Sequence, residues 1–327
     1  MASLAYAAAD NLGAAIEHSR RTPGAEFIAG GTDLLQLLED RVRNPTELID
    51  LNGLPLGGIE VEAGGARLGA LARMAEVADH PLIQKEFPAV AEALLASASP
   101  QVRNMATIGG NLLQRTRCLY YRDAASPCNK RHPGSGCPAQ EGQNRINAIL
   151  GGSHQCIAAY PGDLAVALVA LDATVDIAGA NGLHMLPIRE LHCLPGETPH
   201  IETVLGPGDV ITSVLIPFSA HARRSRYLKI RDRASFQFAL ASAAVALDIK
   251  DGIIKEARVA VGGVATKPWR LEQLERMLVG EPVSPELFRA AALRASEGAA
   301  PREQNRFKVT LIQRVVERAL QMTGGSS

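Results

Sequence analysis

Four of the five cysteines in this chain of 327 residues lie close together in the sequence. Cys118, Cys128, Cys137 and Cys156 follow one another with nine, eight and eighteen residues between them. Thiolates in such a group are ligands for an iron–sulfur cluster or for zinc, and the spacing, which has no C-x2-C pair, does not select the metal. Disulfides are the weaker alternative, because five cysteines are too few, and odd in number, for a disulfide scaffold.

The segment that holds these cysteines is also basic and irregular. Its arginines and lysines outnumber its acids, Asp123 and Glu141; the basic residues are Arg115, Arg117, Arg122, Lys130, Arg131 and Arg145. A tetrathiolate cluster is anionic, so nearby cations would stabilise its more reduced state and raise its reduction potential. The competing interpretation is that these charges only solvate a surface loop. The prolines and glycines of the segment favour a loop that is free to wrap around a cluster.

Two glycine turns have the pattern of an anion site. In "FIAGGTDLL", residues 27–35, a strand leads into Gly30 and Gly31 and then into a helix, so bare N–H groups and a helix N-terminus can meet a pyrophosphate. The alternative is an ordinary turn with Thr32 or Asp33 as N-cap. "ATIGGNLL", residues 106–113, repeats the pattern. Together the two turns could hold opposite sides of one extended dinucleotide.

The surrounding segments predict the elements that position these motifs. Helical spacing at 11–21 and 32–42, with strands at 26–31 and 46–51, predicts a compact βαβ unit. Short strands follow, with helices over 73–97 and 162–173. Alternating runs at 225–234 and 238–264 predict antiparallel strands, and helices are expected from residue 270 onward. We therefore expect an α+β fold in three parts, over 1–56, 57–218 with an insertion at 114–157, and 219–327.

Composition limits the classes of function. The chain is 46% hydrophobic and 21% charged, and 34 basic residues balance 34 acidic ones. This balance argues against a nucleic-acid or membrane-surface role. There is no apolar run of the roughly 20 residues that a membrane span needs. The N-terminal stretch has no basic region ahead of its apolar residues, so we expect no export signal on this chain and no membrane insertion.

The motifs, in their order, resemble a known family. "AGGTDLL", "ATIGGNL", "YPGDLAVALVALDATV" and "YLKIRDRASFQFALASAAV" together resemble the FAD-binding medium subunit of the molybdenum hydroxylases, the xanthine oxidase family. The long cysteine insertion is similar to that of bacterial periplasmic aldehyde oxidoreductases, which holds a [4Fe-4S] cluster. The resemblance implies a two-part FAD domain like that of vanillyl-alcohol oxidase, over 1–56 and 57–218, and a C-terminal domain of sheet and helices. It also implies that Cys118, Cys128, Cys137 and Cys156 are the cluster ligands.

The same resemblance implies which residues bind FAD. The backbone of Gly30, Gly31 and Thr32 should contact the phosphates, Asp163 should lie near the polar chain of the cofactor, and Lys229 near the flavin ring, where a cation would stabilise reduced flavin. From the local pattern alone, Asp163 is a helix N-cap and Lys229 belongs to a solvated strand face. The full expected set is Phe27, Ile28, Ala29, Gly30, Gly31, Thr32, Asp33, Leu34, Thr107, Gly110, Asn111, Asp163 and Lys229.

A role in electron transfer follows from the resemblance. A large partner subunit would bind molybdopterin and oxidise an aldehyde, a small one would carry two [2Fe-2S] clusters, and FAD on this chain would pass electrons to an external acceptor. No catalytic residue is expected here. The alternatives are a xanthine, CO or hydroxybenzoyl-CoA enzyme of the same family, a self-sufficient flavin oxidase and a zinc-stabilised interaction module. The expected location is the periplasm, reached by co-export with a partner, or the cytoplasm.

Overall fold

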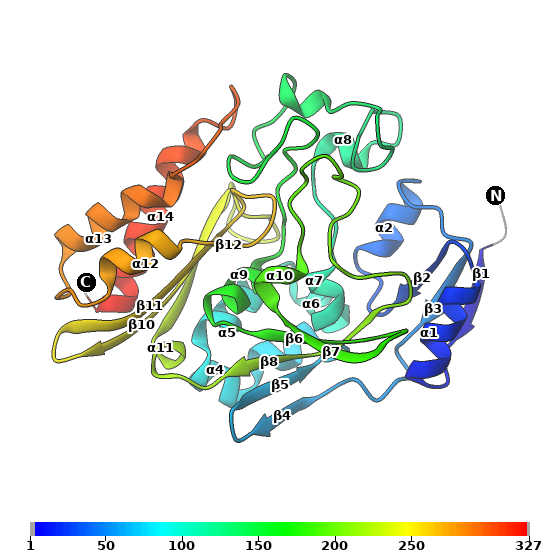
Figure 1. Cartoon of the computed structure of the whole chain (residues 1–327), viewed down its shortest axis with the longest axis horizontal. Helices are drawn as coiled ribbons and strands as arrows, with labels where there is room; N and C mark the ends of the chain where they lie inside the picture. Colours follow the sequence, from blue (N-terminus) through cyan, green and yellow to red (C-terminus); the bar gives the residue numbers. More distant parts are fainter. Residues whose placement is uncertain (1–3, 326–327) are drawn as a thin grey trace.

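The computed structural model describes residues 4–325 as a mixed α and β structure with three separate sheets (Figure 1). The first sheet is parallel, in the order β1-β3-β2, and belongs to the N-terminal unit. Asn11 begins the first helix by accepting the Ala14 N–H at 2.9 Å. The elements of this unit are β1 (Ala5–Ala8), α1 (Leu12–Arg21), β2 (Ala25–Ile28), α2 (Leu34–Glu39) and β3 (Glu47–Asp50).

The second sheet is antiparallel, with strands in the order β4-β5-β8-β6-β7. Its strands are β4 (Ile59–Glu62), β5 (Gly65–Gly69), β6 (Thr174–Gly179), β7 (Gly182–Pro187) and β8 (Val210–Pro217). A single hydrophobic core joins this sheet to the helices that cover it. These helices are α3 (Met74–Asp79), α4 (Pro81–Glu86), α5 (Pro88–Ala96), α6 (Pro100–Met105), α7 (Ile108–Leu112), α9 (Asp163–Ala170) and α10 (Ile188–Leu191).

The predicted helix over 73–97 is wrong in one respect, since it is three helices. Pro81 and Pro88 each stand at the first position of a new helix, α4 and α5. A proline there has no N–H to give to the preceding turn, so each helix ends before it and the chain changes direction.

The third sheet is antiparallel, in the order β12-β11-β10-β9, and is covered on both faces. Alternate residues of β10 belong to the core of the second sheet and to the core beneath the C-terminal helices. Asp251 and Gly252 turn the β10–β11 hairpin with positive φ at both positions, as a two-residue hairpin prefers. The elements are α11 (Ala220–Arg223), β9 (Ser225–Ile230), β10 (Ala241–Lys250), β11 (Ile253–Gly262), β12 (Trp269–Arg270), α12 (Glu272–Leu278), α13 (Pro285–Ala292), a 3-10 turn (Leu293–Ser296) and α14 (Phe307–Gly324).

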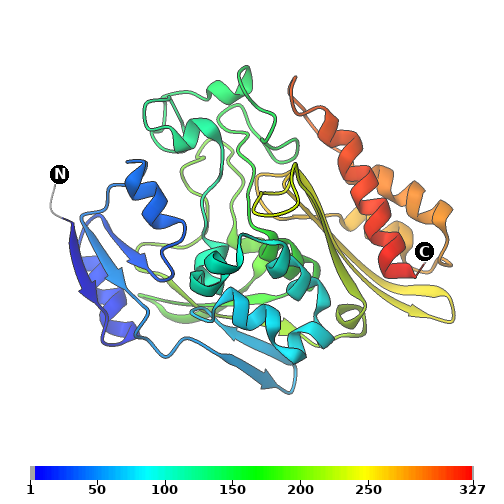
Figure 2. The same cartoon turned by 180° about the vertical axis from the view of Figure 1, so that it is seen from behind.

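The cysteine insertion is mostly irregular. It contains α8 (Leu119–Arg122) and one 3-10 turn (Pro138–Gln140), and within the described residues it adds no strand to any sheet. Both views show it rising above α2, away from the sheets (Figure 1, Figure 2). Among the described residues no helix has the length and apolar character needed to cross a membrane.

Candidate functional site

One large cavity, of about 1090 Å³, is bounded by the N-terminal unit, α7 and the segment that connects α10 to β8. We call this connecting segment, residues 193–209, the strap. Every residue of the predicted FAD set lines this cavity, although the set is drawn from residues 27–34, 107–111, 163 and 229. The volume lies slightly above the roughly 300–1,000 Å³ found for small-molecule sites. The tertiary structure therefore brings the predicted cofactor residues together at one site.

The first glycine turn presents bare backbone to this cavity. In the described part of the chain, the N–H groups of Gly30, Gly31 and Thr32 donate to no acceptor. Gly31 has a φ of +68°, which favours glycine, and a Cβ on Gly30 would overlap the Met105 carbonyl. Consecutive free N–H groups in a turn form an anion-binding concavity. This turn can therefore hold a diphosphate.

The second glycine turn differs from the expectation of exposed backbone. It is the short helix α7, capped by Thr107, whose Oγ1 accepts the Gly110 N–H at 3.2 Å. The N–H of Gly109 donates to Ala70 O and that of Asn111 to Thr107 O, both at 2.8 Å. Its amides are thus used inside the protein, because the helix packs against the end of β5. The side chain of Asn111 remains available, since its buried Oδ1 has no partner among the described residues.

Asp163 and Lys229 form a buried ion pair at the cavity wall. Their side chains are only 5% and 4% exposed, and Lys229 Nζ lies 2.7 Å from Asp163 Oδ2. Tyr227 OH and Ser97 Oγ also donate to this carboxylate, at 2.5 and 2.7 Å. Burial, and then Asp163, raise the pKa of Tyr227 well above its ordinary value, so the phenol stays a donor. Lys229 is therefore a paired ammonium, neither a free cation nor part of a solvated strand face.

Asp163 also differs from a helix cap. It is the first residue of α9, Gly162 is the cap, and no side-chain cap bond is present. The carboxylate instead accepts hydrogen bonds from the three donors of the buried network. Its negative charge in the first turn also stabilises α9, because it interacts favourably with the helix dipole.

Two family models match most of the chain. The FAD binding domain in molybdopterin dehydrogenase matches residues 2–219, and the CO dehydrogenase flavoprotein C-terminal domain matches residues 226–323. The chain belongs to the FAD-binding subunits of the molybdenum hydroxylase family. It is thus a subunit of an oxidoreductase.

Relatives and solved structures agree with this family. The aldehyde oxidoreductase FAD-binding subunit PaoB of Escherichia coli (strain K12) is 45% identical over 306 residues, 92% of each chain. The glyceraldehyde dehydrogenase medium chain of Sulfolobus acidocaldarius is 25% identical, over 92% of this chain and 90% of that one. A carbon monoxide dehydrogenase structure from Hydrogenophaga pseudoflava aligns with a TM-score of 0.76 and 25% identity, over 98% and 97% of the two chains. The predicted α+β fold is confirmed.

The residues at the cavity fit the FAD of this family. The free N–H groups of residues 30–32 suit its diphosphate, and the unpartnered Asn111 Oδ1 suits a hydroxyl of its polar chain. A bound FAD would supply redox chemistry in steps of one or two electrons. The residues of this molybdenum hydroxylase subunit that line the cavity would then have the role of binding the cofactor.

The four clustered cysteines line a second, small cavity beside the FAD cavity, and Cys156 lines both. Two of the four sulfurs have hydrogen-bond donors: Asn147 Nδ2 lies 3.5 Å from Cys118 Sγ, and the Ala158 nitrogen lies 3.4 Å from Cys156 Sγ. Burial raises the pKa of Cys156 to about 11, so a metal is needed to hold it as thiolate. All five cysteines are free thiols, and no three metal-binding side chains in residues 4–325 are placed to hold a single ion. Four thiols that line one cavity have the ligand chemistry of an iron–sulfur cluster or of zinc.

Most basic residues of the insertion have specific partners. Arg117 and Arg122 bind Asp33 at 2.9 and 2.8 Å, so Asp33 anchors the insertion to the glycine turn and makes no side-chain cap bond. Arg131 donates to the carbonyls of Tyr120 and Tyr121, at 3.0 and 2.7 Å, and shapes the loop. These side chains are therefore structural parts of the site, which neither earlier interpretation of the charges expected.

The sequence analysis missed several residues at the site, among them Ser97 and Tyr227 of the Asp163 network and Glu202. Glu202 of the strap is ion-paired with Arg115 and with Lys130, whose Nζ lies 2.9 Å away. The only signal for it was indirect: a basic insertion needs acidic partners elsewhere, and the sequence does not say which acids these are.

Proposed function

We propose that this chain is the FAD- and [4Fe-4S]-bearing electron-transfer subunit of a molybdenum-dependent aldehyde oxidoreductase. The observation that carries the proposal is the 45% identity to an aldehyde oxidoreductase FAD-binding subunit over 92% of both chains. The cavity with free N–H groups and the four cysteines at the adjacent cavity support the two cofactors.

The proposed electron path has two partner subunits. A large subunit with molybdopterin oxidises the aldehyde to a carboxylic acid, whose added oxygen comes from water, and releases two electrons and two protons. A small subunit with two [2Fe-2S] clusters carries the electrons singly to FAD on this chain, where two electrons and two protons give reduced FAD. The reduced FAD then delivers the pair to an external acceptor. The substrate is chosen in the large subunit, so this chain alone has no aldehyde activity.

The first test is an anaerobic absorption spectrum of the purified complex, with flavin, iron and zinc measured on this subunit after non-denaturing separation. About one FAD and about four irons per chain are expected. Flavin with zinc, or with no metal, would overturn the cluster and leave the FAD assignment standing. A chain without flavin would overturn the whole proposal.

A second test replaces one ligand. Cys128→Ser should remove most of the iron from this subunit and lower its FAD content, because Cys128 lines the small cavity with the other three cysteines. Cys193→Ser is the matched control for the iron content alone, since Cys193 lies outside the small cavity but lines the FAD cavity. Unchanged iron in the Cys128 variant would contradict the assignment of the ligands.

The compartment is a separate proposal. We propose that the folded chain reaches the periplasm only together with a partner that carries an export signal. Cell fractionation with and without the co-expressed partners tests this. Finding the chain in the periplasm when it is expressed alone, or in the cytoplasm with all partners present, would contradict it.

A further inference from the structure

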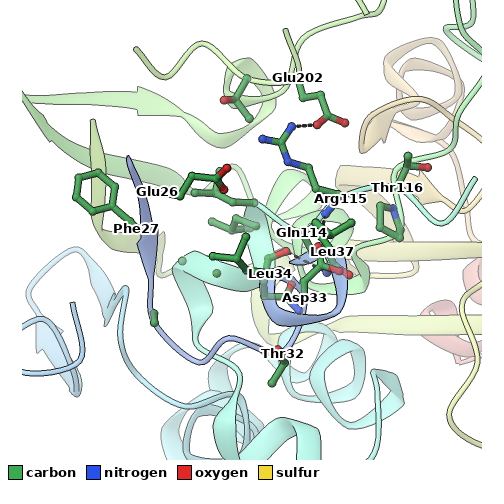
Figure 3. Close-up of a pocket in the computed structure, with 18 of the residues that line it drawn as sticks. Glu26, Phe27, Thr32, Asp33, Leu34, Leu37, Gln114, Arg115, Thr116 and Glu202 are labelled. Atoms are coloured by element: carbon green, nitrogen blue, oxygen red, sulfur yellow. Dashed lines mark hydrogen bonds and ion pairs between the residues drawn. The ribbon is translucent and has the colours of Figure 1, made fainter. Parts of the chain in front are cut away.

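The cysteine insertion holds two walls of the FAD cavity at once. The Arg115 backbone N–H donates to Asp33 Oδ2 at 2.7 Å, and the Arg115 guanidinium is ion-paired with Glu202. Asp33 belongs to the glycine turn and Glu202 to the strap, and all three residues line the cavity. Figure 3 shows the Arg115 side chain reaching Glu202, with their ion pair drawn as a dashed line. One residue of the insertion therefore bridges the glycine turn and the strap.

Further contacts strengthen this bridge on both sides. On the side of the glycine turn, Asp33 also binds Arg117 and Arg122. On the side of the strap, Lys130 Nζ lies 2.9 Å from Glu202 Oε1 and donates to Pro199 O at the same distance. The side chains of Asp33 and Glu202 are only 16% and 19% exposed. Partly buried ion pairs are less screened by water and salt than surface pairs, so these contacts can hold the two walls together.

The bridging residues lie next to the cysteines in the chain. Arg115 and Arg117 precede Cys118, and Lys130 follows Cys128 by two residues. Near Cys156, Ser153 Oγ donates to Gly196 O of the strap at 2.8 Å and Gln155 Nε2 to Glu197 Oε2 at 3.2 Å. Bonds from the four thiolates to a cluster would therefore also restrain the backbone next to the cysteines, and with it the residues that contact the glycine turn and the strap.

We propose that the insertion is a clamp on FAD, closed by the cluster that the four cysteines bind. The clamp consists of Arg115 and Lys130 with their partners Asp33 and Glu202. This inference rests on the proposed function, and it gives the cluster a role in retaining FAD: with the cluster formed, the strap and the glycine turn stay joined and FAD leaves slowly. Without the cluster, or without Glu202, the strap separates from the insertion and FAD leaves faster.

The experiment measures the release of FAD from the purified complex, followed by the recovery of flavin fluorescence after dilution. Glu202→Gln keeps the size of the side chain but removes the charge that Arg115 and Lys130 share. The rate of FAD release from this variant should rise by about tenfold or more, because the loss of a partly buried charge pair mainly raises the dissociation rate. Glu190→Gln is the matched control, because Glu190 is exposed and lies outside the strap, and its release rate should not change.

A second arm links the clamp to the cluster. Removing iron with an anaerobic chelator should speed FAD release from the unsubstituted complex by a similar factor, and much less from the Glu202 variant. Such non-additivity indicates one shared interaction.

Unchanged release in a folded, FAD-loaded Glu202 variant would overturn the clamp. If the isolated complex holds no iron, the cluster of the proposed function fails and the link to it fails as well, while the Glu202 result still decides whether the clamp exists.

Discussion

At the scale of single residues, the ion pair of Asp163 with Lys229 alters the expected charge of the cavity wall. The sequence places a basic residue on a strand, and family resemblance places it near the flavin ring. In the structure, two of the three ammonium donors are used inside the protein, by Asp163 and by Ala96 O at 3.1 Å. The pair contributes little net charge to the cavity, and its first role is to hold α9, β9 and the end of α5 in place.

Lys229→Met tests this role. The substitution leaves Asp163 buried without its cation, so the free energy of unfolding should fall by about 3–5 kcal/mol. Urea unfolding of the FAD-loaded chain measures this loss of stability. Lys250→Met is the control, because Lys250 is exposed and its ion pair with Asp248 is long, at 3.7 Å. A variant of full stability in which only the flavin potential changes would instead support a free cation at the flavin.

At the scale of elements, the strand–turn–helix of β2 and α2 determines the proposed diphosphate site. Its turn exposes three N–H groups because Gly31 takes a positive φ and because Gly30 lies directly against the backbone of Met105 and Ala106. The turn is therefore packed against the loop before α7. The second glycine motif therefore supports the site through this packing contact. It does not offer a second set of free N–H groups.

Gly30→Ala should lower the FAD content of the purified chain. The new Cβ would overlap the Met105 carbonyl, which is backbone and cannot rotate away, so the turn must shift and its N–H groups lose their alignment. We expect a cost of about 1–3 kcal/mol in stability and a matching loss of FAD affinity, measured by titration of the flavin-free chain. Gly53→Ala is the control, since nothing lies within 4 Å of its added Cβ. Equal affinity in the two variants would contradict the close packing.

At the scale of the whole molecule, Lys308 joins three distant regions. It lies on α14 and is fully buried, and its Nζ donates to Ile146 O, Asn147 O and Gly263 O at 3.1, 3.0 and 2.7 Å. The first two belong to the insertion and the third follows β11. The three carbonyls use all three protons of the ammonium, without a carboxylate. The C-terminal helix is thus fastened to the insertion by a buried amine that donates to backbone carbonyls.

Lys308 predicts how stability depends on pH. Burial, followed by the charge of Arg145, lowers the pKa of Lys308 from 10.5 to about 7. Between these values the unfolded chain binds a proton that the native chain lacks, so the free energy of unfolding should rise with pH from about 7 toward 10. The slope from this group is on the order of 1 kcal/mol per pH unit at most. Lys308→Met should lose this part of the slope when urea unfolding is compared at pH 7 and pH 9. Parallel slopes in the two proteins would show that Lys308 keeps its charge.

The sequence by itself determined the features that depend on neighbouring residues. Paired glycines between a strand and a helix predict an anion turn, because backbone freedom is a local property. The alternating runs after residue 218 predict antiparallel strands, because the alternation of side chains is also a local property. The order of four motifs indicates the family. Pro81 and Pro88 were also readable as helix breaks, and the expected single helix ignored them.

Only the tertiary structure decided which distant residues meet. The spacing of the cysteines does not say that all four line one cavity beside the FAD cavity, and no local pattern pairs Arg115 with Asp33 and Glu202 or Lys229 with Asp163. The amphipathic pattern also could not show that β10 is buried on both faces. The physical reason is that a charge or a thiol is compatible with many partners, and its partner is set by the packing of elements that are far apart in the chain.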